Sequence, residues 1–126
     1  MGQLAGMMEE VVWRLPTPSQ EFMQGPHVLV SPGKVTLRWD SEDESGNYGW
    51  SFAEFTGVEA VTFTAHSSCT PDQARAYDRL VKVDPSDMVP RLRGAGQKFL
   101  QHFRIYFDEI GCLDVVAEDF IPPREN

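Results

Sequence analysis

The chain has 126 residues, 41% of them hydrophobic, which is enough for one globular domain with a substantial core. Its 19 acidic and 11 basic residues give a formal net charge of −8, which argues against nucleic acid and anionic membranes as partners and favours a basic protein. No stretch approaches the roughly 18 consecutive apolar residues of a membrane span, and the N-terminus lacks a secretion signal, which predicts a cytoplasmic protein.

Residues 1–26 are predicted to form a partly flexible N-terminal arm. Pro16 and Pro18 interrupt any long element there, and only residues 11–13 look apolar enough to be buried. Residues 27–126 are predicted to form the single folded domain.

Four strands are predicted after the arm, at residues 27–30, 34–40, 48–55 and 58–66. In the second of them Val35, Leu37 and Trp39 alternate with polar residues, which is typical of an antiparallel strand with one face in water. The connections between these strands are short. They predict an antiparallel meander.

A helix is predicted over residues 71–82, because Thr70 can cap it, Pro71 suits its first turn and Gln73 completes a capping box. A second, shorter helix is predicted over about 84–92. The fold predicted from this order is α+β, with a mainly antiparallel, twisted sheet of about six strands and two helices inserted between strands four and five.

The last third of the chain is predicted to be a hairpin that turns at residues 108–111. A loop with Gly111 in the left-handed conformation pairs Phe107 with Leu113 and gathers apolar side chains on one face, which we predict to be core. The other face then carries polar side chains at unusual density, namely His102, Arg104, Tyr106, Asp114 and Glu118.

These five residues are the candidate ligand-binding site. Arg104 would bind an anion through two N–H groups, and His102, oriented by Glu118, would carry a proton. Two structural alternatives stay open. The one we favour is a set of opposite-charge pairs on a water-exposed sheet face. The other is a network buried beneath the helices, in which the polar groups satisfy one another.

The loop at residues 40–47 concentrates four carboxylates, those of Asp40, Glu42, Asp43 and Glu44. Calcium favours such oxygen ligands, but the EF-hand spacing fails because glycine is seventh and the twelfth position is a serine. The four carboxylates are therefore the candidate partner-binding residues, forming an acidic patch for a basic protein.

Other chemistry-bearing residues lack the pattern that a catalytic or metal site needs. His66 and Cys69 have no second Cys/His pair to complete a zinc site. Cys112 is predicted to be a buried thiol, and Ser86 lacks the glycines of a nucleophile elbow. We predict no disulfide, no catalytic residue, no metal and no cofactor.

Aromatic residues cluster on the second and third predicted strands, as Trp39, Tyr48, Trp50, Phe52 and Phe55. Such a set is more often core than a ligand cleft or protein-binding face. Trp50 and Phe52 share one face of the strand and Phe55 points to the other. One face therefore needs a cover, and a second copy of the chain, making a homodimer, is one way to provide it.

The C-terminal third carries a recurring pattern: Ser86, the strand from His102 to Phe107, the pair Gly111-Cys112, and Val115-Val116-Ala117. In this pattern the chain resembles a group of small bacterial proteins that end in a histidine-led aromatic strand and a glycine-cysteine turn. Leu113 departs from the aromatic residue expected after the cysteine. The resemblance implies a compact bacterial accessory protein and no particular activity.

From these observations the expected function is that of a small acidic bacterial protein that binds a basic protein without catalysis, of the toxin-neutralising immunity type. The alternative is a small-anion-binding protein or enzyme that uses the polar face of the C-terminal hairpin.

Overall fold

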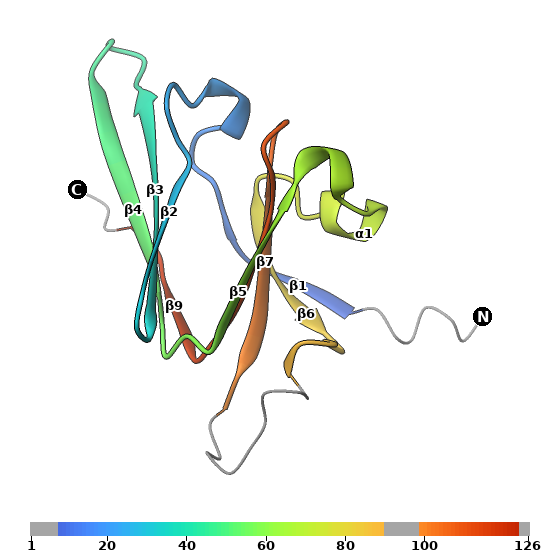
Figure 1. Cartoon of the computed structure of the whole chain (residues 1–126). Helices are drawn as coiled ribbons and strands as arrows, with labels where there is room; N and C mark the ends of the chain where they lie inside the picture. Colours follow the sequence, from blue (N-terminus) through green and yellow to red (C-terminus); the bar gives the residue numbers. More distant parts are fainter. Residues whose placement is uncertain (1–7, 90–98, 124–126) are drawn as a thin grey trace.

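The computed structural model describes residues 8–89 and 99–123 (Figure 1). These residues are mostly strands. Two short 3-10 helices (η2 and η3) and the one-turn helix α1 lie in the connections between strands. In chain order the elements are β1 (Met8–Arg14), η2 (Ser19–Glu21), β2 (His27–Ser31), β3 (Lys34–Glu42), β4 (Tyr48–Thr56), β5 (Ala60–Ala65), η3 (His66–Ser68), α1 (Pro71–Ala74), β6 (Arg79–Asp84), β7 (Gln101–Phe107), β8 (Gly111–Ala117) and β9 (Asp119–Ile121).

Two antiparallel sheets pack against each other (Figure 1). One has the strand order β1-β6-β7-β8-β5 and the other the order β2-β3-β4-β9. Alternate residues of strands in both sheets point into the space between them and form the main core. Its largest side chains are fully buried, among them Trp39, Phe55, Phe103, Phe107 and Leu37.

The predicted α+β fold with two inserted helices is wrong. The predicted start of the first helix is correct, since Gln73 N–H donates to Thr70 Oγ1 at 3.2 Å and Thr70 N–H to Gln73 Oε1 at 2.9 Å. However, α1 ends at Ala74, and it is the only α-helix that lies wholly within the described ranges. Of the second predicted helix, residues 90–92 lie outside the described residues.

Strand β6 replaces the second half of the predicted helix. Asp78 has a positive φ of 56°, which a helix does not allow, and the chain then pairs with β1 on one side and β7 on the other. Leu80 faces the main core while its neighbour Val81 packs on the opposite face, which is the period of a strand. Pairing with two strands therefore overrides the helical spacing of the apolar residues.

The four strands predicted at residues 27–66 are present as β2 to β5, but they do not form one meander. β2, β3 and β4 pair consecutively, whereas β5 pairs with β8 in the other sheet. The segment predicted to be an arm contributes β1, which pairs with β6. Phe22 from the same segment stacks on Trp39 with ring centroids 6.2 Å apart. Residues 1–7 lie outside the description.

The C-terminal hairpin is present as β7 and β8, with a register two residues away from the predicted one. Phe107 pairs with Gly111 and not with Leu113, and the left-handed residue of the loop is Glu109, at φ 55°. A shift of two residues preserves which side chains share a face, so the predicted core face is correct. Gly111 has a φ of 147°, which residues with a side chain rarely adopt, and a Cβ there would also collide with the Thr64 carbonyl of β5.

Candidate functional site

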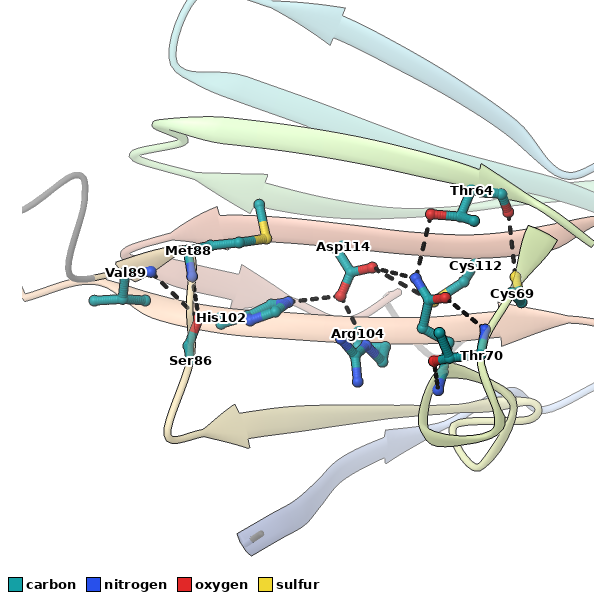
Figure 2. Close-up of polar contacts among 11 residues, drawn as sticks. Thr64, Cys69, Thr70, Ser86, Met88, Val89, His102, Arg104, Cys112 and Asp114 are labelled. Carbon is teal, nitrogen blue, oxygen red and sulfur yellow. Dashed lines mark hydrogen bonds and ion pairs between the residues drawn. The ribbon is translucent and has the colours of Figure 1, made fainter. Parts of the chain in front are cut away.

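The polar face of the β7–β8 hairpin lies on the side of the five-stranded sheet that faces away from the main core. Helix α1 and the segment around Ser86 lie over this face (Figure 2). His102 and Asp114 are 4% and 3% exposed, so these predicted site residues are buried. The face is therefore not the water-exposed surface that the favoured alternative assumed.

Asp114 is the centre of a buried hydrogen-bond network (Figure 2). One carboxylate oxygen, Oδ1, accepts from His102 Nε2 at 2.6 Å and from Arg104 Nε at 2.8 Å. The other accepts from Gln73 Nε2 at 3.3 Å, which ties α1 to the sheet. Burial alone would raise the pKa of Asp114, but the His102 hydrogen bond and the Arg104 charge hold this pKa below its usual range.

His102 connects Asp114 to Ser86. The Ser86 hydroxyl lies 2.7 Å from His102 Nδ1 and also accepts the N–H groups of Met88 at 3.0 Å and Val89 at 3.2 Å. Because its oxygen already receives two donors, the hydroxyl donates its own proton to Nδ1. His102 Nε2 then carries the proton that Asp114 accepts.

The line Ser86–His102–Asp114 contains the residue types of a hydrolytic triad, but its surroundings oppose catalysis. A nucleophilic serine needs free lone pairs, whereas the Ser86 oxygen accepts two backbone N–H groups in the manner of a helix cap. A pocket of about 350 Å³ lies beside Ser86 and His102. Their polar atoms are already bonded to each other, so the line anchors residues 86–89 to the sheet.

The remaining candidates of the hairpin separate in space. Tyr106 shares the buried face, where its hydroxyl contacts His66 Nδ1. Glu118 lies against the turn at Gly57. Its predicted role of orienting His102 belongs to Asp114, which pairs with Arg104 and reaches His102 diagonally across the two strands.

Both thiols on this face are poor nucleophiles. Burial raises the pKa of Cys112 far above its ordinary value and also raises that of Cys69. The two cysteines are free.

Of the four acidic candidates, Asp40 is fully buried. Its carboxylate accepts backbone N–H groups from three successive residues, Met23, Gln24 and Gly25, at 2.8–3.0 Å, and the Tyr48 hydroxyl at 2.7 Å. Burial would raise the pKa of Asp40, yet these hydrogen bonds lower it to about 2. Asp40 therefore fastens the chain before β2 to β3 and offers no free oxygen to a partner.

The other three acidic candidates are exposed: Glu42 is the last residue of β3, and Asp43 and Glu44 lie in the turn between β3 and β4. Asp43 closes this turn, because Oδ1 accepts the N–H groups of Ser45 and Asn47, each at 2.9 Å. Glu42 and Glu44 have no partner among the described residues. We call Glu42, Asp43 and Glu44 the acidic turn.

The outer face of β4 carries three residues of the aromatic cluster that the sequence shows but that was not predicted to be a site. Tyr48 is 47% and Phe52 50% exposed. Trp50 lies between them, with the Arg38 guanidinium 4.6 Å from its ring centroid. The period-two spacing of residues 48, 50 and 52 was the available signal. Ser86 had no such signal, since its link to His102 spans 16 residues.

Comparison with protein-family models, with curated proteins and with solved structures gives no match. Among the described residues no helix is long and apolar enough to cross a membrane.

Proposed function

We propose that the protein is a non-enzymatic binding module that engages a basic protein through the acidic turn. The observation that carries this proposal is that Glu42 and Glu44 are exposed on a turn held in place from both sides. Asp43 closes the turn from within, and Asp40 and Tyr48 fix its base. Carboxylates displayed on a fixed turn attract a basic partner without first having to be ordered.

The state of the groups that could perform chemistry supports binding over catalysis. In the described part of the chain, Ser86, His102 and Asp114 are bonded to one another, and Arg104 adds to the same carboxylate. An anion that approached Arg104 would have to compete with Asp114. Free thiols at Cys69 and Cys112 suit the reducing cytoplasm, where we place this interaction.

The experiment is an affinity capture from host lysate at low and moderate salt. It compares wild type with the double variant Glu42→Lys/Glu44→Lys. A matched control, Glu10→Lys/Asp84→Lys, makes the same change of charge at exposed positions of the other sheet. Wild type and control should capture the same basic protein, and the acidic-turn variant should lose it.

Capture by wild type should also weaken as salt rises, because exposed charges are screened within about 10 Å at 0.1 M ionic strength. Equal capture by both charge variants would contradict the proposal. The two turn substitutions are not expected to unfold the protein, since neither glutamate has a partner in the described structure. Thermal melting of each variant checks this assumption.

A further inference from the structure

Strand β4 has an open edge. β9 pairs only with Glu54, Phe55 and Thr56, so residues 48–53 have β3 on one side and no strand on the other among the described residues. A groove of about 630 Å³ runs along this edge. Its lining comes from residues 50–54 of β4, which end in the charged Glu54, and from residues 121–123 at and after the end of β9, which include Pro122 and Pro123.

Backbone hydrogen-bonding groups are available in the groove. Asp43 N–H donates to the Asn47 carbonyl at 2.9 Å, which sets the alternation of the β3–β4 ladder. Successive residues of a strand direct their backbone groups to alternate sides. Starting from Asn47, residues 49, 51 and 53 therefore direct their N–H and C=O groups to β3, whereas residues 48, 50 and 52 direct theirs to the open edge. The bond from Glu118 N–H to the Thr56 carbonyl, on the β9 side, fits the same alternation.

The open edge lacks the features that keep free strands from pairing. Residues 48–53 contain no charge and no proline, and two of the three side chains on the outer face are about half exposed. β2 and β5 are uncharged edges too, but β2 is a five-residue strand between Pro26 and Pro32, and β5 carries one aromatic residue. The edge of β4 combines free backbone groups, aromatic side chains and a groove.

We propose that this edge receives an extended segment of the basic partner, which pairs antiparallel with residues 48–52 as an added strand. The identity of the occupant rests on the proposed function. The segment would place apolar side chains against Trp50 and Phe52. An antiparallel strand runs toward Tyr48, so its C-terminal end reaches the acidic turn. Lysine or arginine at that end would face Glu42 and Glu44.

A second copy of the chain fits the edge less well. Two antiparallel β4 edges would bring the acidic turn of each copy toward the end of β9 and Pro122 of the other, which already lie along the edge. The charge of −8 on each copy opposes such pairing as well.

The test uses the purified full chain and a short synthetic peptide that alternates valine and threonine and ends in lysines. Amide hydrogen exchange by NMR is measured with and without the peptide. The amides of Tyr48, Trp50 and Phe52 should exchange at least tenfold more slowly when it is bound. A matched peptide ending in glutamates should bind about tenfold more weakly at low salt, and this difference should disappear at high salt.

Two variants separate backbone pairing from contact with the ring. Trp50→Ala removes the ring but keeps the edge N–H, whereas Trp50→Pro removes both, without removing a bond to β3. The lysine peptide should bind Trp50→Ala about tenfold more tightly than Trp50→Pro. Exchange in wild type decides the question independently if Trp50→Pro does not fold.

Unchanged exchange at millimolar peptide overturns the strand-addition proposal, whatever the lysate capture shows. Equal binding of the lysine and glutamate peptides overturns the proposal that the occupant is basic. Protection of the edge amides without peptide, together with a dimer in sedimentation, assigns the edge to a second copy. Conversely, failed capture from lysate with a protected edge would remove the proposed function and keep the edge as a strand-binding site.

Discussion

The β7–β8 hairpin and the β3–β4 hairpin are both antiparallel, and each packs one face against the same core. They differ in whether the face turned away from this core is covered or exposed. On β7–β8 the second face carries His102 and Asp114, which are buried, and Arg104, which is partly buried, and both His102 and Arg104 bind the Asp114 carboxylate. On β3–β4 the second face carries Tyr48 and Phe52, which are about half exposed. Polar residues are hidden on one hairpin and aromatic residues are displayed on the other.

This contrast teaches that residue type alone does not locate a functional surface. The hairpin with the conventional catalytic residue types is the one whose groups are already satisfied within the molecule. Unsatisfied hydrogen-bonding groups and apolar surface remain on the β4 edge, where a partner can still lower the free energy.

The largest expected effect comes from Asp114→Ala. It leaves the buried His102 and the partly buried Arg104 without their acceptor, which should lower the free energy of unfolding by about 3–5 kcal/mol. As a control, Glu118→Ala changes a carboxylate that directly follows β8 and lies outside the network. It should lower the free energy of unfolding by less than about 1 kcal/mol. Urea unfolding measures both. A loss below about 1 kcal/mol for Asp114→Ala would show that the network does not hold the fold.

The next effect is a loss of stability in acid that depends on Asp40. Its pKa in the folded protein is about 2, below the usual 3.8, so its stabilisation is complete above about pH 4 and is lost as pH falls toward 2. This lowering of the Asp40 pKa contributes about 2 kcal/mol to the free energy of unfolding above pH 4. Between pH 5 and pH 2, the free energy of unfolding should fall less steeply for Asp40→Asn than for wild type. The lowered pKa of Asp114 acts in the same direction, so some decline should persist.

If the pH dependence of Asp40→Asn equals that of wild type, Asp40 does not fasten the segment before β2. Glu42→Gln provides the control, because this nearby carboxylate is exposed in the acidic turn and should leave the curve unchanged.

A smaller effect is expected for Ser86→Ala. Loss of the cap for Met88 and Val89 and of the His102 hydrogen bond should cost about 1–2 kcal/mol. Wild type should not react with a fluorophosphonate probe, since the Ser86 oxygen is engaged as an acceptor. Labelling of wild type that disappears in Ser86→Ala would instead make this line a catalytic site.

The smallest effect on stability is expected at the displayed face. Trp50→Ala should cost about 1 kcal/mol or less, whereas Phe55→Ala on the opposite face of the same strand should cost about 3–5 kcal/mol. Thermal and urea unfolding compare the two. Similar losses would mean that the outer face of β4 is held as firmly as the core, which would weaken its assignment as a binding surface.

Sequence patterns predicted the local elements well where one face of a strand is core. Val35, Leu37 and Trp39 are all fully buried, as their alternation indicated. The capping box at Thr70 is also present. The helix predicted beyond it fails because Leu80 and Val81 fit a helix and a doubly covered strand equally well, and only pairing with β1 and β7 decides between them.

By itself, the sequence determined which side chains share a face, since the two-residue period of a strand is a property of the backbone. It did so even on the β7–β8 hairpin, where the predicted register was two residues off. Tertiary structure alone decided what covers each face: α1 and Ser86 over Asp114, residues 23–25 over Asp40, and, in the described part of the chain, no strand paired with the outer edge of residues 48–53 of β4. Coverage depends on contacts between segments far apart in the chain, and no local pattern encodes them.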